Sequence, residues 1–176
     1  YIGLSASQFP VQSAIISVVG GDFPKSYLES LQSHRINTSA IEIINEEKTF
    51  FWSGRYHKNM NERDTITTEL NVLTKFNPIV PDAFKDASIV VLGNLAPANQ
   101  ANVISQLTNP KALIILDTMN FWMDNALNEL LEVIKSVDVI TINDEEARQL
   151  TGENSLVVAA RKIYEMGPKF VVIKKG

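Results

Sequence analysis

The amino-acid sequence predicts an α/β protein in which a parallel sheet is covered by helices. Short apolar runs rich in β-branched residues alternate with helical patterns along most of the chain. A length of 176 residues with 45% hydrophobic content suits one domain with a substantial core. Residues 41–70 break the pattern, because strand-like runs follow one another there without helices. We therefore expect a body formed by residues 1–40 and 71–176, with residues 41–70 inserted as a small antiparallel β lid.

The chain opens with one strand-turn-helix unit. Residues 14–19 predict a strand that ends at Gly20 and Gly21, and Asp22 with Pro24 then begins a helix whose apolar residues share one face. The glycine spacing does not match the Gly-x-Gly-x-x-Gly fingerprint of dinucleotide-binding folds, and no Gly-x-x-x-x-Gly-Lys phosphate loop occurs. Both observations weigh against a dinucleotide-binding or P-loop protein.

The inserted segment predicts consecutive strands. They span residues 41–44, 49–56 and 64–70. Parallel neighbours need a crossover of about a dozen residues, usually a helix, so these strands are expected to pair antiparallel as a separate layer. In the middle run Phe50, Trp52 and Tyr56 alternate with other residues, which predicts an aromatic face. Such a face would serve as a lid, as a dimer surface or as an extension of the core.

The second half of the chain repeats the alternation of strand and helix. The predicted strands are residues 88–93, 112–117, 137–142 and 170–173, and the predicted helices are residues 99–107, 125–135, 144–150 and 155–165. This order implies a parallel sheet covered on both faces. Ligands of open α/β sheets bind at the carboxyl ends of the strands, so the polar residues at those ends are the candidate site residues.

An Asn-x-x-Glu pattern stands where the strand 137–142 ends. Asn143 is followed by Asp144, Glu145 and Glu146 in the first turn of the predicted helix. The helix dipole stabilises each carboxylate by at most about 1 kcal/mol, yet the carboxylates repel one another, and a divalent cation would relieve that repulsion. The same spacing outlines a capping box, in which Asn143 and Glu146 satisfy each other's backbone N–H groups. Both interpretations can hold together.

Composition narrows the classes of partner. Lys and Arg number 16 against 20 Asp and Glu, and the basic residues are scattered, so nucleic acid is not expected as a partner. No apolar run approaches the roughly 18 residues of a membrane span. The absence of cysteine fits a cytoplasmic protein.

His34 and His57 lack partners at metal-ligand spacing and are expected on the solvated surface. A start at Tyr1 and an end directly after a strand suggest a segment of a longer protein.

The order of these features resembles the ribokinase family, also called the PfkB family of carbohydrate kinases. The residues that carry the resemblance are Val19-Gly20-Gly21-Asp22, the turn at residues 36–39, Thr49 at the start of a lid strand, Asp117 with Asn120, residues 143–146 and residues 173–176. The resemblance extends from about Ser13 onward. It implies a ribokinase-like fold, a cytoplasmic location and ATP-dependent phosphorylation of a sugar hydroxyl with Mg²⁺. It also allows a homodimer formed through the lid.

The resemblance implies roles on the nucleotide side. Glu146 would help to organise Mg²⁺, largely through water, and Asn143 would support it, in agreement with the preference of Mg²⁺ for few carboxylates and several waters. Lys174 and Gly176 match the Thr-x-Gly-like turn that the family places at the nucleotide. Lysine instead of threonine departs from that pattern, which leaves Lys174 between a phosphate contact and a surface lysine.

On the acceptor side, the resemblance implies that Asn94 reaches the substrate and that Asp117 helps to shape the site. Many relatives have Asp-x-Asn, whereas this chain has Asp117-Thr-Met-Asn120, and the inserted residue weakens the match of Asn120. The aromatic residues that follow, Phe121 and Trp122, are expected to pack beneath the site together with Met123.

The family's Gly-Gly-x-x-x-Asn and Gly-Ala-Gly-Asp stretches do not occur in these residues. The second stretch supplies the anion hole and the catalytic base, so no catalytic residue is assigned here, the base is expected beyond Gly176, and the segment alone is expected to be inactive. A nucleoside kinase of the same family is the near alternative for the parent enzyme. A non-enzymatic α/β ligand-binding domain is an alternative of another class, and a Rossmann dehydrogenase is weaker because its glycine fingerprint is missing.

Overall fold

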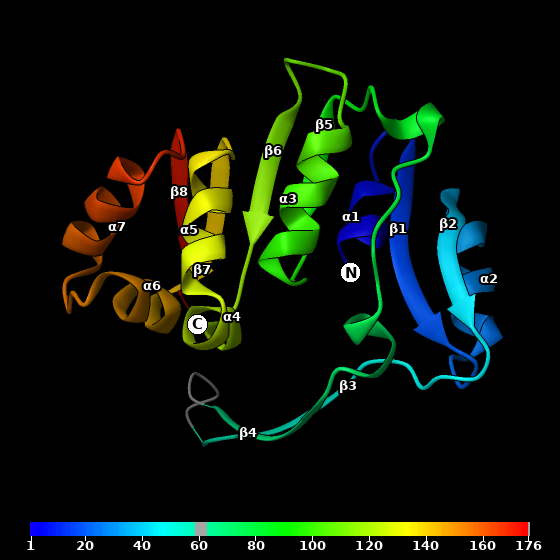
Figure 1. Cartoon of the computed structure of the whole chain (residues 1–176), viewed down its shortest axis with the longest axis horizontal. Coiled ribbons are helices and arrows are strands. Elements are labelled where there is room, and N and C mark those ends of the chain that lie inside the picture. The colour runs from blue at the N-terminus through cyan, green and yellow to red at the C-terminus, as the bar shows by residue number, and fades with distance from the viewer. Residues whose placement is uncertain (59–62, 176) are drawn as a thin grey trace. The chain divides into compact units, whose positions relative to one another are not determined.

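The structure is a computed structural model that describes residues 1–58 and 63–175 (Figure 1). The chain divides into two compact units, Tyr1–Phe84 and Lys85–Gly176. No helix within the described residues is long and apolar enough to cross a membrane. His34 and His57 are both exposed, as predicted.

The described residues of the first unit form one parallel two-stranded sheet and one separate antiparallel hairpin. Its elements are α1 (Ile2–Ala6), β1 (Ser13–Gly20), α2 (Lys25–Ser33), β2 (Ile36–Ile44), β3 (Phe51–Tyr56), β4 (Arg63–Glu69) and the 3₁₀ helices η1 (Asn71–Thr74) and η2 (Asp82–Phe84). The buried apolar residues of this unit include Val18, Val19, Ile36, Val72, Phe76, Pro78 and Val80. The predicted strand and helix at the start of the chain are therefore both present.

The assignment of residues 41–44 to an antiparallel insertion is wrong, and so is the predicted turn at residues 36–39. Both belong to β2, which runs parallel to β1. The α2 helix between the two strands supplies the crossover that parallel pairing requires. The antiparallel layer in the described part of the insertion consists of β3 and β4, with Phe51 opposite Glu69 and Trp52 opposite Thr68. Residues 59–62 of the predicted lid lie outside the described residues.

The segment that precedes β3 is tied to the carboxyl end of β1. Thr49 donates its backbone N–H and its hydroxyl to Asp22 Oδ1, at 2.8 and 2.7 Å, and Gly20 N–H donates to Thr49 Oγ1 at 2.9 Å. These hydrogen bonds from Thr49 lower the pKa of Asp22. A Cβ atom at Gly20 would stand 2.4 Å from the backbone of residues 47–49, so only glycine permits this approach.

The aromatic residues of the β3–β4 hairpin differ in their packing and exposure. Its register shifts between Ser53 and Gly54. The Trp52 ring lies over Gly54, where an added Cβ would meet Trp52 Cη2 at 2.4 Å, and Trp52 Nε1 donates to Thr65 Oγ1 at 3.3 Å. Trp52 therefore packs on its own hairpin, whereas Phe51 and Tyr56 are about half exposed.

The second unit is a four-stranded parallel sheet in the order β5-β6-β7-β8. Its elements are β5 (Ile89–Leu92), α3 (Pro97–Gln106), β6 (Leu113–Asp117), α4 (Asn120–Asn125), α5 (Leu127–Lys135), β7 (Val139–Asn143), α6 (Asp144–Thr151), α7 (Leu156–Glu165) and β8 (Phe170–Lys174). The predicted α/β class with a parallel sheet and a small antiparallel hairpin is confirmed. The predicted helix 125–135 begins later, and the short helix α4 precedes it.

The core of the second unit lies between the sheet and its helices, of which α3 and α5 stand in front of the strands in Figure 1. Its buried members are Leu92, Leu116, Met123, Leu130, Val133, Ile134, Val137, Ile140, Ile142, Ala147, Ala159 and Ile163. The other sheet face carries apolar residues that are 37% to 62% exposed, namely Ile89, Val91, Leu113, Phe170 and Val172. Within the described residues of this unit, the helices thus cover one face and not the two that the strand-helix alternation predicts.

Asp138 holds the amino ends of three strands together. Its Oδ2 accepts the backbone N–H of Ile114 at 2.9 Å, and its Oδ1 pairs with Lys169 Nζ at 2.7 Å. Its backbone carbonyl accepts the N–H groups of Lys169 and Phe170. The hydrogen bond from Ile114, followed by that from Lys169, lowers the pKa of Asp138 below its ordinary value of 3.8, although burial opposes the shift.

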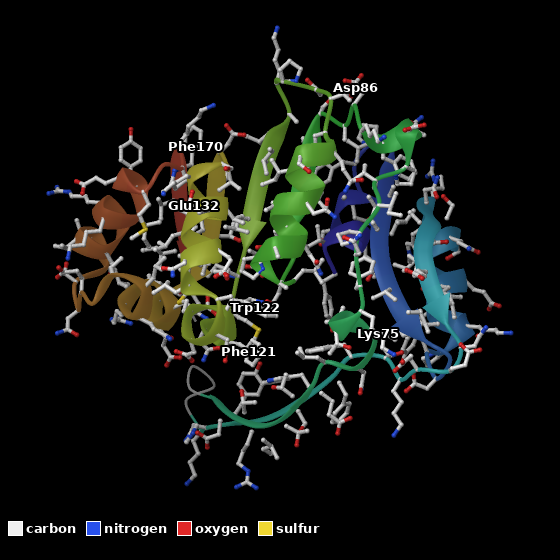
Figure 2. All side chains as sticks on the ribbon, in the orientation of Figure 1. Lys75, Asp86, Phe121, Trp122, Glu132 and Phe170 are labelled. Carbon is white, nitrogen blue, oxygen red and sulfur yellow. The ribbon has the colours of Figure 1, made fainter. Side chains whose placement is uncertain are left out.

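Because the folded state lowers this pKa, the contribution of Asp138 to stability is complete above pH 3.8 and is lost as pH falls through the folded pKa. We predict that Asp138→Asn in the whole protein lowers the free energy of unfolding near pH 7 by about 1 kcal/mol, because a charged acceptor becomes neutral. The deficit should shrink as the pH approaches about 2. Urea denaturation across this range measures it, with the exposed Asp86→Asn as control (Asp86 is labelled in Figure 2). A deficit that stays constant with pH would contradict the assignment.

Candidate functional site

The candidate site lies at the carboxyl edge of the sheet in the second unit. Because all four strands run parallel, their carboxyl ends meet at one edge. Asp117 ends β6, Asn143 ends β7 and Lys174 ends β8, and Asn94 follows two residues after β5. The register places Asp117 opposite Thr141 and Asn143 opposite Lys174.

Asn143 and Glu146 form a complete capping box at the start of α6. Glu146 N–H donates to Asn143 Oδ1 at 2.8 Å, and Asn143 N–H donates to Glu146 Oε2 at 3.0 Å. Glu146 is 5% exposed. The capping interpretation is confirmed, and the cap also fixes the Glu146 carboxylate where β7 ends.

The acidic first turn of α6 is partly neutralised by a residue of the same helix. Arg148 Nη1 donates to Asp144 Oδ2 at 2.8 Å. That hydrogen bond holds the pKa of Asp144 below its ordinary value against the opposing effect of burial. The remaining carboxylates are the exposed Glu145 and the buried Glu146. In residues 1–58 and 63–175, no three His, Cys, Asp or Glu side chains gather as a metal site.

Asp117 and Lys174 meet directly, although the sequence assigned them to opposite sides of the site. Lys174 Nζ lies 2.8 Å from Asp117 Oδ1, and Thr141 Oγ1 lies 3.1 Å from the same oxygen. The lysine side chain is 52% exposed and the aspartate 31%. An ion pair this exposed is worth at most about 1 kcal/mol, so either partner can turn to a ligand at little cost. Gly176, the other residue assigned to the nucleotide turn, lies outside the described residues.

Asn94 is held by the segment that follows β6. Trp122 Nε1 donates to Asn94 Oδ1 at 2.7 Å, and Asn94 Nδ2 donates to Met119 Sδ at 2.7 Å. The Trp122 ring stands edge-to-face with Phe121, with centroids 4.8 Å apart (both are labelled in Figure 2). Trp122 thus forms a polar contact in addition to the packing that the sequence predicts.

The other candidates from this segment, Met123 and Asn120, form no hydrogen bond with Asn94 or Asp117 in the described residues. Met123 is buried in the core. Asn120 is exposed at the start of α4, where its Oδ1 accepts Phe121 N–H at 3.0 Å. Among the described residues, Asn120 is not a hydrogen-bond partner of Asp117. The structure therefore does not bring these two residues together as the Asp-x-Asn pattern of many relatives would suggest.

Two polar residues at this edge escaped the sequence analysis. Thr141 is the hydroxyl-bearing residue within the apolar strand β7, a signal that local reading could have flagged. Gln100 on α3 is 1% exposed and donates its side-chain amide to backbone carbonyls of Gly93 and Asp117. Its position on the buried side of α3 is visible only once the helix is placed on the sheet.

Comparisons with known proteins identify the family. The family described as pfkB family carbohydrate kinase matches residues 4–176. A cytidine kinase from Thermococcus kodakarensis is 25% identical over 179 residues, covering 99% of this chain and 62% of the relative. The apo crystal structure of a putative ribokinase II from E. coli superposes with a TM-score of 0.80 at 19% identity, covering 99% of this chain and 60% of that one.

A nucleoside kinase from Methanocaldococcus jannaschii, described as an archaeal member of the ribokinase family, superposes with a TM-score of 0.73 at 20% identity, covering 99% of this chain and 56% of that one. The two structural similarities show the fold. The chain spans about 60% of the length of these relatives. Since the family match includes nearly every residue, the chain belongs to the PfkB family of carbohydrate kinases.

Proposed function

We propose that the whole protein transfers the terminal phosphoryl group of ATP to a hydroxyl of a sugar in the cytoplasm. The observation that carries the proposal is the capping box of Asn143 and the buried Glu146, beside the Asp117 and Lys174 pair at the carboxyl edge of the sheet in a chain of the kinase family. Phosphoryl transfer depends on positioning and charge neutralisation, and both are functions that such groups can perform.

A nucleoside is the second candidate acceptor. It is favoured by the similarity to a protein described as a cytidine kinase. The phosphate-handling residues do not separate the two acceptors, because both classes transfer the same group.

The residues at the carboxyl edge fit ATP with Mg²⁺. When bound, Mg²⁺ neutralises phosphate charge. Glu146 is 5% exposed and commits Oε2 to a backbone N–H, so a water-mediated contact with the ion suits it better than direct coordination. Asn143 holds that carboxylate in place. The chain also superposes on a protein described as a putative ribokinase II in complex with ATP and Mg²⁺, with a TM-score of 0.76 at 18% identity.

In this proposal Lys174 contacts the nucleotide and Asp117 contacts the acceptor. The ammonium group of Lys174 would turn from Asp117 toward a phosphate, and Asp117 would then accept a hydrogen bond from an acceptor hydroxyl. The exposure of the pair makes this exchange inexpensive. The base that takes the proton of the reacting hydroxyl is proposed outside these 176 residues.

A screen of the whole protein with ATP and Mg²⁺ against sugars and nucleosides tests the proposal. We predict sugar-dependent release of ADP. Turnover with nucleosides alone would select the second candidate, and ADP release that no acceptor stimulates would contradict a kinase.

We predict that Glu146→Gln lowers kcat by about 10-fold to 100-fold and raises the Mg²⁺ concentration needed for half-maximal rate. The amide can still accept Asn143 N–H, so the fold and the cap should remain while the charge is lost. Rates measured across a Mg²⁺ titration report both effects. The exposed neighbour Glu145→Gln serves as the matched control. Unchanged rate and Mg²⁺ dependence in Glu146→Gln would leave this residue with only its capping role.

We also propose that the β3–β4 hairpin acts as the lid, excludes water around the bound acceptor and contributes to a homodimer. The exposure of Phe51, Tyr56 and Ile66 supports an interaction surface there. Because Trp52 packs on Gly54 and bonds Thr65, its removal should loosen the hairpin itself.

For Trp52→Ala in the whole protein we predict faster ATP hydrolysis without acceptor and a higher acceptor KM, because a loosened hairpin admits water. Coupled ADP assays and the subunit mass in solution measure these effects. Phe51→Ala, which removes an exposed ring of the same strand, separates loss of hairpin order from loss of surface. Wild-type values for hydrolysis, KM and mass in Trp52→Ala would remove the lid assignment.

A further inference from the structure

Gln100 joins two strand ends that the sheet itself leaves unjoined. The last paired residues of β5 and β6 are Leu92 and Leu116. One residue further, Gln100 Nε2 donates to the Gly93 carbonyl at 2.8 Å and to the Asp117 carbonyl at 3.2 Å. A side-chain amide has two N–H donors, so both are used in this bridge. The side chain thereby continues the ladder by one step, from α3.

The two bridged carbonyls lie at or immediately before the residues assigned to the acceptor. Gly93 immediately precedes Asn94, and the Asp117 carbonyl belongs to the residue whose carboxylate faces Lys174. Toward β7, Asp117 is held by pairing with Thr141. On the side of β5, the Asp117 carbonyl is linked to Gly93 through the side chain of Gln100. Gln100 therefore supplies a buried link between the Asn94 and Asp117 segments.

Space alone does not fix the Gly93 segment. A Cβ atom added at Gly93 would meet nothing within 4 Å, so there is open space on that side of the backbone. The outer link between the two segments is the contact of Asn94 with Met119 and Trp122, which uses an exposed asparagine. Hydrogen bonds that are shielded from water restrain a segment more firmly than exposed ones do.

The burial of Gln100 carries a cost in free energy. Within the described residues, its Oε1 is buried without a hydrogen-bond partner. An unpartnered buried acceptor costs free energy that an apolar side chain of similar volume would avoid. The amide at this place therefore suggests a function that methionine or leucine could not perform, namely holding the two carbonyls.

We propose that Gln100 is a positioning residue: it fixes the distance between the segments that begin at Gly93 and Asp117, and through them the placement of Asn94 and Asp117 against the acceptor. The acceptor part of this inference rests on the proposed function. The restraint on the two segments does not.

The test uses Gln100→Met in the whole protein, which keeps the length of the side chain and removes both donors. Gln32→Met is the matched control, because it is the same substitution at an exposed glutamine of α2, whose amide donates to Thr38 Oγ1. Two readouts are needed: hydrogen exchange of peptides that contain residues 93–96 and 117–120, and steady-state kinetics with the acceptor and ATP varied separately.

We expect Gln100→Met to exchange faster in both peptides, with the peptide of β7 unchanged, and to raise the acceptor KM on the order of 10-fold while the ATP KM stays at the wild-type value. Gln32→Met should change none of these. Should Gln100→Met fail to fold, Gln100→Asn replaces it, because the shorter amide cannot span both carbonyls and should give the same pattern.

Unchanged exchange in both peptides overturns the inference whatever the kinetics show. Faster exchange with equal rises in both KM values, or with a loss in kcat alone, overturns the role in placing the acceptor. A wild-type protein without acceptor-dependent turnover defeats the proposed kinase function instead, and the exchange measurement still decides whether Gln100 restrains the two segments.

Discussion

Parallel pairing of β5, β6, β7 and β8 is the constraint on which the candidate site depends. Successive residues of a strand point to opposite faces, so Leu116, Ile140 and Ile142 enter the core while Asp117, Thr141 and Lys174 share the face away from the helices. A slip of one residue would exchange the two sets and bury the charges. The hydrophobic core therefore fixes which polar side chains meet at the carboxyl edge.

The same edge shows how one group of atoms serves folding and chemistry together. The capping box satisfies backbone N–H groups that any helix start must satisfy, and it does so with the carboxylate that the kinase proposal needs. Arg148 forms an ion pair with Asp144, which reduces the repulsion between carboxylates around Glu146. The buried Glu146 side chain is thus kept in place by local hydrogen bonds, without a gathered set of metal ligands among the described residues.

Local patterns predicted most of the fold and part of the site. The strands and helices of the second unit follow from periodicity, and the Asn143 and Glu146 pair follows from its spacing of three. The start of β2 did not, because its polar Asn37, Thr38 and Ser39 look like a turn, whereas they lie in a strand whose pairing with β1 shifts register at this point. The contacts of Gln100 and the meeting of Asp117 with Lys174 depend on strand register, which no local pattern contains.

The two tryptophans of the chain fall one in each unit, in different surroundings. The indole of Trp122 donates to Asn94 at the carboxyl edge of the sheet, and that of Trp52 lies over Gly54 in the hairpin. Indole emission depends on hydrogen bonding and on exposure to water, so each ring is a built-in fluorophore for one part of the molecule. A variant that keeps only one of them would let the hairpin and the carboxyl edge be followed separately by light, without an attached label.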